Sequence, residues 1–139
     1  MTVYLAGPWI AKAQVKEARA KLEAAGIKVR ASWIDNHGSD SHAGLQREAI
    51  VDFNQILEAD ALVLLNLAKS EGKATELGYA YGLGKRILVV GRPEDLDRNV
   101  FYNLPHIEHF PALEGAIQCL IFPRKTVNTL ARNHSALAN

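Results

Sequence analysis

Apolar and polar positions along the chain follow two alternating patterns. Short, nearly continuous apolar runs rich in Val, Ile and Leu are typical of strands buried on both faces of a sheet. They predict strands at 2–7, 27–34, 60–67 and 86–90, with a short edge strand at 106–110. Between these runs, apolar residues recur at helical spacing and predict amphipathic helices. The helices occupy 11–26, 45–59, a segment around Glu76 that ends near Gly82, and 111–121.

Alternation of strand and helix predicts a parallel sheet whose right-handed crossovers place helices on both faces. We therefore predict an α/β three-layer sandwich with a parallel sheet of about five strands. In such sheets the ligand crevice lies beyond the carboxyl ends of the strands. The segments expected to line it are 7–10, 33–45, 66–76 and 91–104. The polar stretch 35–44 is the candidate lid.

Composition fits one globular domain. The chain has 139 residues, of which 48% are hydrophobic and 22% charged, and its formal charge is +1. We assign residues 1–122 to the domain and treat the polar segment 123–139 as a C-terminal tail. A charge so near zero disfavours a nucleic-acid polymer or an anionic membrane as the partner and favours a small molecule. A single cysteine, with no basic and apolar leader, leads us to expect a cytoplasmic protein.

Glu76 stands in the opening turns of a helix that is otherwise small and apolar. It shares a helical face with Ala80 and Leu83, so we expect it to lean toward the packed side. Free amides near the helix N-terminus would favour the ionised carboxylate. Such a group in a strand-end crevice is a competent nucleophile toward an electron-poor sugar carbon. Glu76 also fits an ordinary first-turn glutamate that complements the helix dipole.

Asp52 lies in the preceding helix, at the margin of an apolar face that includes Phe53 and Ile56. Burial tunes the protonation of such a carboxyl, as a general acid requires. A solvated edge residue is the alternative interpretation. Cleavage of a glycosidic bond with retention uses one nucleophilic carboxylate and one acid/base group close together. The crossovers would bring Asp52 and Glu76 near each other. The pair therefore indicates glycosidic cleavage with retention more specifically than either residue does alone.

Two other chemistries are disfavoured by spacing. The stretch "GYAYGLGKR" at 78–86 is not a phosphate-binding loop, because its glycine spacing is wrong, Arg86 replaces the Ser or Thr, and a strand follows it. The five histidines show no pair on one helical turn and no accompanying thiolates, so we expect no metal site.

Three segments resemble the nucleoside 2-deoxyribosyltransferase family, which includes 2′-deoxynucleoside 5′-phosphate N-hydrolases. They are "YLAGPW" at 4–9, "VDFNQILEADALVLL" at 51–65 and "ATELGYAYGLGKRILVV" at 74–90, and the likeness extends over residues 2–120. The resemblance implies a flavodoxin-like fold, no metal or organic cofactor, and a homo-oligomer, at least a dimer, whose active site is completed by a neighbouring subunit. It also implies a small-molecule deoxynucleoside or deoxynucleotide as substrate and a free nucleobase as partner.

The resemblance further assigns roles to residues. Glu76 matches the nucleophile that attacks C1′ of deoxyribose. Asp52 matches the aspartate that assists proton transfer to and from the base, and Tyr4 matches the residue that holds the nucleophile. Trp9 and Trp33 would face the base, although simple packing explains them equally well. Asn99 with Phe101 is the nearest equivalent of the pair that a partner subunit donates to the sugar 5′-hydroxyl. The remaining substrate contacts are Ala6, Gly7, Ser70 and Gly72.

The chain departs from the patterns of the transferases and of the hydrolases at one place each, and these departures bear on which reaction is predicted. The transferases commonly carry an aspartate six residues before the nucleophile, where this chain has Ser70, as the nucleotide hydrolases do. The hydrolases also carry a serine and an arginine after the first strand, where this chain has Pro8, Trp9 and Ile10. The primary prediction is therefore transfer of 2-deoxyribose between nucleobases. Hydrolysis of 2′-deoxynucleoside 5′-monophosphates is the alternative, and a nucleotide-sensing module without catalysis is the non-enzymatic one.

Overall fold

The computed structural model describes residues 1–92 and 98–122, and the predicted tail at 123–139 lies outside the described residues. Five parallel strands form one sheet in the order β2-β1-β3-β4-β5. Their bounds are β1 Thr2–Ala6, β2 Lys28–Arg30, β3 Ala61–Leu65, β4 Arg86–Val90 and β5 Glu108–Phe110. The predicted sheet is confirmed, including the short edge strand near residue 108.

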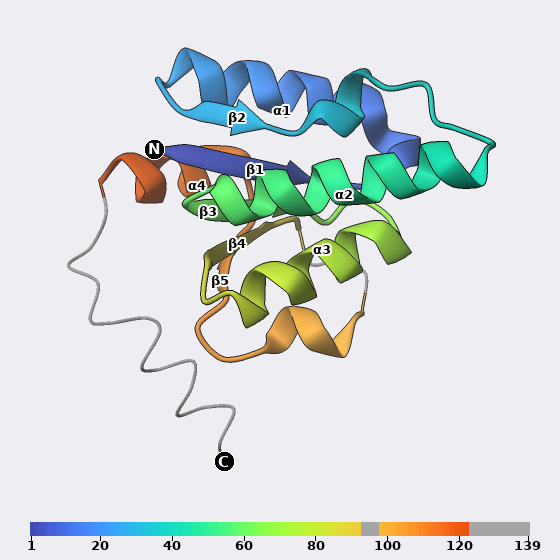
Figure 1. The fold of residues 1–139 in the computed structure, drawn as a ribbon. Helices are drawn as coiled ribbons and strands as arrows, with labels where there is room; N and C mark the ends of the chain where they lie inside the picture. Colours follow the sequence, from blue (N-terminus) through green and yellow to red (C-terminus); the bar gives the residue numbers. More distant parts are fainter. Residues whose placement is uncertain (93–97, 123–139) are drawn as a thin grey trace.

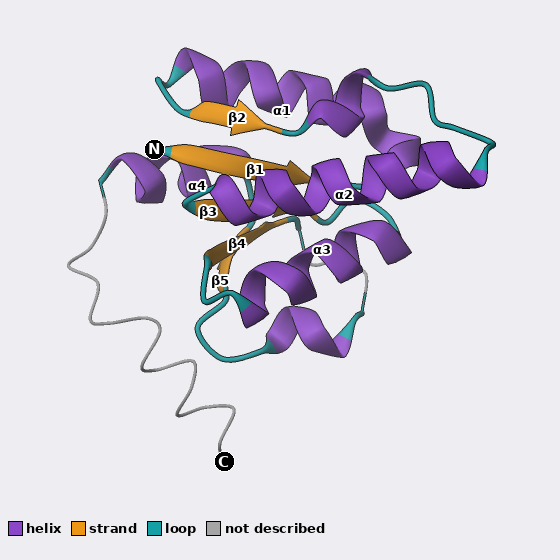
Figure 2. Cartoon of the chain, in the orientation of Figure 1, coloured by secondary structure: helices purple, strands orange, loops and turns teal. Residues whose placement is uncertain are grey.

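Helices cover both faces of this sheet (Figures 1 and 2). One face carries α1 (Lys12–Ala24) and α4 (Leu113–Ile121), and the other carries α2 (His42–Glu58) and α3 (Glu71–Gly82). The Lys21 ammonium lies 3.3 Å from the Glu114 carboxylate and links α1 to α4. The arrangement is a flavodoxin-like three-layer α/β fold, as predicted. None of the described helices is long and apolar enough to cross a membrane.

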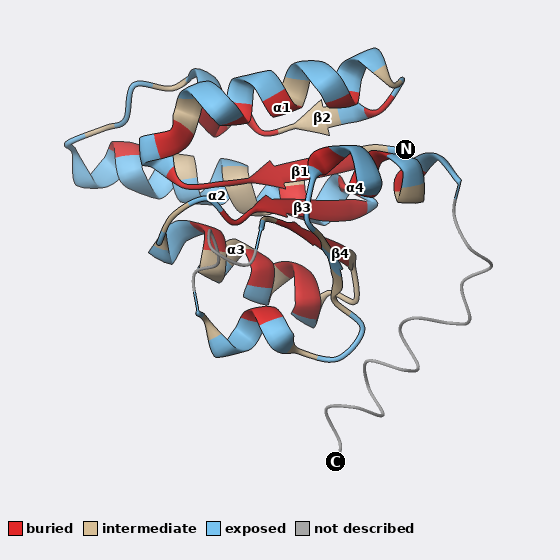
Figure 3. Cartoon of the chain, turned by 180° about the vertical axis from the view of Figure 1, so that it is seen from behind, coloured by how far each residue is buried: buried red, intermediate tan, exposed pale blue. Residues whose placement is uncertain are grey.

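The core lies along the two central strands. Every residue of β3 is buried, and so is every residue of β1 after Thr2 (Figure 3). Both strands have helices on their two faces, which explains why their sequences are continuously apolar instead of alternating. This buried centre fixes the position of Tyr4, a residue of β1 with no exposed surface.

The end of β2 and the start of α2 differ most from the prediction. The second strand ends at Arg30, and the chain then forms a 3₁₀ turn, η2 (Ser32–Asp35), that buries Trp33 and Ile34. These apolar residues were included in the strand because burial in a turn and burial in a sheet give the same short apolar signal. Helix α2 begins at His42, earlier than predicted, because the Ser41 hydroxyl caps it by accepting from the Gly44 amide at 3.0 Å.

We expect Gly7→Ala to destabilise the fold. A Cβ at Gly7 would lie 2.8 Å from Cγ2 of Val15 on α1, so the methyl group would push the helix away from the end of β1. The overpacking should lower the free energy of unfolding by about 1–3 kcal/mol, measured by urea denaturation. Gly78→Ala is the matched control, because a Cβ there meets nothing within 4 Å. Replacing this glycine inside α3 should raise the free energy of unfolding by about 0.5–1 kcal/mol. Equal effects at the two positions would contradict the close approach at Gly7.

Candidate active site

A cavity of about 190 Å³ opens beyond the carboxyl ends of β1 and β3. It collects residues from four separate segments of the chain. Its lining comprises Gly7, Trp9, Trp33, Asn36, Glu48, Asp52, Ser70, Gly72, Lys73 and Glu76. Seven of the residues predicted from the sequence therefore share one cavity, and both candidate carboxylates are among them.

Stacked aromatic rings bring the two carboxylates together. Phe53 on α2 and Tyr79 on α3 stack with ring centroids 3.9 Å apart and planes inclined by 3°. This contact joins the two helices side by side on one face of the sheet (Figure 1). Asp52 is the neighbour of Phe53 and Glu76 lies one turn before Tyr79, so the stack also sets the positions of both acids.

Tyr4 holds Glu76. The tyrosine hydroxyl donates a hydrogen bond to Oε2 of Glu76 from the fully buried centre of β1. Burial raises the pKa of Tyr4 above its ordinary value, and the negative charges of Glu76 and Asp52 raise this pKa further. Tyr4 therefore keeps its proton and acts as a permanent donor to the carboxylate.

Burial opposes the ionised state of Glu76 that the sequence predicts. Burial raises the pKa of Glu76 to about 8, the hydrogen bond from Tyr4 lowers it, and the charge of Asp52 raises it. The helix begins at Glu71 after the cap Ser70, so Glu76 lies in the second turn. The unpaired amides belong to the first turn, so Glu76 is not the first-turn partner of the helix dipole.

Asp52 is half-buried, so the alternative of a solvated edge residue is also wrong. Burial raises the pKa of Asp52 to about 6, and the charge of Glu48 one turn earlier raises it as well. The raised pKa values of Glu76 and Asp52 favour retention of a proton in this cavity near neutral pH. The site thus holds an acid and a potential nucleophile side by side.

Two tryptophans form one wall of the cavity. Trp33 is buried, and its indole nitrogen donates to the Leu5 carbonyl at 2.9 Å. Trp9 is 50% exposed, with its ring centroid 6.3 Å from that of Trp33. The Lys12 ammonium lies 3.7 Å from the centroid of Trp9 and also donates to the Asn36 carbonyl. Trp33 is therefore a fixed base for the wall, and Trp9 forms its accessible rim.

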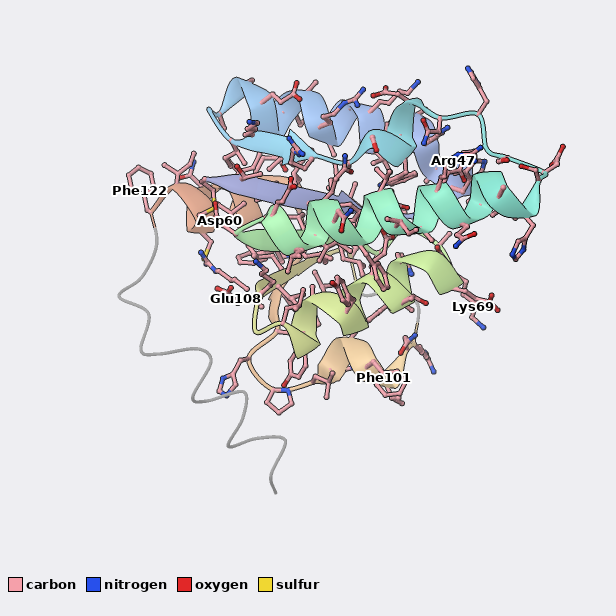
Figure 4. All side chains as sticks on the ribbon, viewed as in Figure 1. Arg47, Asp60, Lys69, Phe101, Glu108 and Phe122 are labelled. Atoms are coloured by element: carbon pink, nitrogen blue, oxygen red, sulfur yellow. The ribbon has the colours of Figure 1, made fainter. Side chains whose placement is uncertain are left out.

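Three predicted contacts lie outside this cavity. Ala6 is fully buried in β1. Asn99 and Phe101 line a second, larger cavity of about 930 Å³ between α3 and the 3₁₀ turn η4 (Val100–Asn103). Figure 4 shows Lys69, just before α3, and Phe101, on η4, which both line this second cavity. Ser70 lines both cavities and marks the place where they adjoin.

Glu48, Asn36 and Lys73 were not among the predicted site residues. Lys73 has no exposed surface, and its ammonium donates to the Tyr102 hydroxyl at 2.9 Å. Helical spacing gave a usable signal for two of them, because Glu48 precedes Asp52 by one turn and Lys73 precedes Glu76 by nearly one turn. Asn36 gave no such signal, because it enters the cavity from an irregular segment.

A comparison with protein families identifies the chain. The model of the nucleoside 2-deoxyribosyltransferase family matches residues 3–104, which is more than half of the sequence. The chain belongs to this family. The nucleoside 2-deoxyribosyltransferase family comprises enzymes that cleave N-glycosidic bonds or transfer the sugar from one such bond to another. None of the curated proteins compared with the chain matches it.

Solved structures share the fold of this family member at low sequence identity. A 2-deoxyribosyltransferase of Bacillus psychrosaccharolyticus is 20% identical with a TM-score of 0.67, over 84% of this chain and 90% of the other. A conserved protein of Enterococcus faecalis V583 is 16% identical with a TM-score of 0.67, over 85% and 95%. The CMP N-glycosidase of Clostridium botulinum is 17% identical with a TM-score of 0.61, over 88% and 100%. At these identities the likeness establishes the fold.

We expect the protonation of Glu76 to contribute to stability. Its pKa is raised from 4.5 to about 8 in the folded chain, so the contribution is complete below about pH 4.5 and is lost as the pH rises through 8. Glu76→Gln mimics the protonated acid. Its free energy of unfolding relative to the wild type should therefore increase steadily between pH 4.5 and pH 8, measured by urea denaturation across that range. A difference that does not change with pH would show that Glu76 is ionised in the folded protein.

Proposed function

We propose that the protein transfers 2-deoxyribose between nucleobases through a covalent ester with Glu76. The observation that carries this proposal is the hydrogen bond from the buried Tyr4 to Glu76, in one cavity with Asp52 and below an aromatic wall. A tyrosine that keeps its proton orients one carboxylate oxygen and leaves the other oxygen of that group available to attack.

The first step forms the ester. An oxygen of the Glu76 carboxylate attacks C1′ as the bond between C1′ and the base nitrogen breaks, and Asp52 delivers a proton to the departing base. With a pKa of about 6, Asp52 is mostly ionised near neutral pH, so it relays to the base the proton that Glu76 holds with its pKa of about 8. Passage of this proton through Asp52 to the base leaves Glu76 ionised at the moment when it must bond to carbon.

The second step reverses the first with another base. A nitrogen of the incoming base attacks C1′, the ester bond to Glu76 breaks, and the proton of the incoming base passes to Asp52. Two displacements at one carbon retain its configuration. The tryptophan wall supports this exchange, because an aromatic surface binds the flat face of different bases in turn.

A second candidate is hydrolysis of 2′-deoxynucleoside 5′-monophosphates. The larger cavity adjoins the Glu76 cavity at Ser70 and is lined by the cationic side chains of Lys69 and Arg98. A 5′-phosphate would find complementary charge there. Water would then replace the incoming base in the second step.

We also propose that the protein assembles at least as a dimer. Asn99 and Phe101 do not line the cavity that holds Glu76 in their own subunit, and Phe101 is 60% exposed. A neighbouring subunit offering the same segment would complete a shared site.

Glu76→Ala should abolish turnover by at least about 10⁴-fold, because the covalent step is lost. The assay mixes a deoxynucleoside, or its 5′-monophosphate, with and without a free acceptor base, and the products are separated by chromatography. Transfer predicts an acceptor-dependent product from the nucleoside, whereas hydrolysis predicts free base from the monophosphate. Intact-mass spectrometry should show a deoxyribosyl adduct on the wild type and none on the variant. Glu23→Ala, an exposed carboxylate on α1, is the control. Turnover retained by Glu76→Ala would refute the mechanism.

A mixture of two inactive variants tests the shared site. If Asn99 acts in the neighbouring subunit's cavity, unfolding and refolding Glu76→Ala with Asn99→Ala protein should restore about a quarter of wild-type activity, since mixed dimers contain one intact site. Each variant refolded alone should remain inactive. No recovery in the mixture, with dimers present by sedimentation, would place Asn99 in its own subunit's site, and full activity of Asn99→Ala refolded alone would place it in none.

A further inference from the structure

Glu48 lies at the junction of two cavities. It lines the Glu76 cavity and also a cavity of about 480 Å³ that is formed with the segment ahead of α2. Asn36 is the other residue common to both linings. The outer cavity is also lined by His37 and Arg47, and Figure 4 labels Arg47 on α2. A ligand that extends from Asp52 along α2 into the outer cavity therefore passes Glu48 and Asn36.

The three carboxylates of the Glu76 cavity form a row. Glu48 lies one helical turn before Asp52 on α2, and both line the cavity with Glu76. The charge of Glu48 raises the pKa of Asp52, and the charge of Asp52 raises the pKa of Glu76. Among the described residues, no three acidic, histidine or cysteine side chains are grouped so as to hold a metal ion. The order from the centre of the site outward is Glu76, Asp52, Glu48.

The Glu48 carboxylate is available to a ligand. It is half-buried and makes no hydrogen bond or ion pair with the described residues. At Asn36 the backbone carbonyl accepts from Lys12, which fixes the backbone and leaves the side-chain amide beside the cavity. The Glu48 oxygens are not among the described side-chain atoms that are buried without a partner, so they stay accessible from the cavity. A bound donor would take the place of water at this carboxylate.

The identity of the donor follows from the position of the base, and this step rests on the proposed function. With C1′ at Glu76 and the glycosidic nitrogen at Asp52, the base points outward along α2. One helical turn, about 5.4 Å, separates Asp52 from Glu48 and is comparable with the length of a nucleobase. The edge that reaches Glu48 is therefore the one opposite the glycosidic bond.

We propose that Glu48, together with Asn36, reads this far edge and selects bases that carry an amino group there. An ionised carboxylate only accepts hydrogen bonds, so it binds the amino group of cytosine or adenine. It repels the carbonyl oxygen that uracil, thymine or hypoxanthine presents at the same place. The protein would accordingly prefer amino bases to their oxo counterparts.

A purely electrostatic role for Glu48 predicts something different. If Glu48 only raises the pKa of Asp52, its replacement changes the rate with every base by a similar factor, because Asp52 protonates all of them. The ratio of rates between an amino base and its oxo counterpart would then stay constant. This ratio separates recognition of the base from tuning of the acid.

The test is Glu48→Gln assayed with two matched pairs, deoxycytidine against deoxyuridine and deoxyadenosine against deoxyinosine. A glutamine amide can rotate and donate to a carbonyl, so the preference should collapse. We expect kcat/KM of the wild type to favour the amino member of each pair, and the variant to lower that ratio by about 10-fold to 100-fold, the value of one hydrogen bond to a charged group. Glu23→Gln on α1 has the same charge change away from every cavity described above and should leave both ratios unchanged.

Binding separates failure of this inference from failure of the proposed reaction. Calorimetry of deoxycytidine and deoxyuridine with the Glu76→Ala protein, with and without Glu48→Gln, compares recognition without chemistry. An unchanged ratio in both assays, or a wild type that prefers the oxo bases, would overturn the role of Glu48. A wild type that binds amino bases selectively but turns over none of them would refute the reaction and keep the recognition.

Discussion

The hydrogen bond between Tyr4 and Glu76 is the contact on which the site depends. It connects the fully buried centre of β1 with the second turn of α3, and its Glu76 end lines the cavity. Burial raises the pKa of both groups, so the donor stays protonated and the carboxyl resists ionisation. The consequence is a carboxyl whose orientation is fixed by the sheet and whose charge develops only when its proton moves elsewhere. Asp52, with a pKa near 6, is the neighbour that can pass that proton on.

The order of the strands explains why these groups meet. From β1 the chain crosses through α1 to β2 on one side, and β3, reached through α2, pairs with β1 on the other. The two crossovers use opposite faces of the sheet (Figure 1). Such a topology leaves a crevice at the carboxyl ends of β1 and β3, where the Glu76 cavity lies. Gly7 and Trp9 leave β1 at this point, and Ser70 starts α3 beyond β3. The stack of Phe53 on Tyr79 then closes the gap between the two helices that carry the acids.

The sequence alone predicted the sheet and most of the cavity, because both depend on local periodicity and on the rule that strand ends face the crevice. It failed where local signals are ambiguous. The apolar residues Trp33 and Ile34 extended the predicted strand into a turn, since burial looks the same in both. The sequence gives no measure of how deeply Glu76 is buried, and burial is the main cause that opposes its ionisation; the helix also begins at Glu71 after the cap Ser70, which places Glu76 in the second turn. The resemblance assigned Asn99 and Phe101 to the site of a neighbouring subunit, and this stays a prediction; in their own subunit they line the larger cavity beside α3.

The distribution of charge along the groove indicates how a substrate lies in it. Carboxylates occupy one end, from Glu76 through Asp52 to Glu48, and the cations Lys69 and Arg98 line the other end beyond Ser70. Lys73, which also lines the Glu76 cavity, already donates a hydrogen bond to the Tyr102 hydroxyl. Glu71 also lines the end beyond Ser70, so the contrast rests on the carboxylate end, where a phosphate would meet repulsion. Under the proposed function, the base would lie on the side of Glu48 and the 5′ end of the sugar on the side of Ser70, with the anomeric carbon between them at Glu76. This orientation would place Asp52 next to the nitrogen that must leave, which is where the chemistry requires a proton.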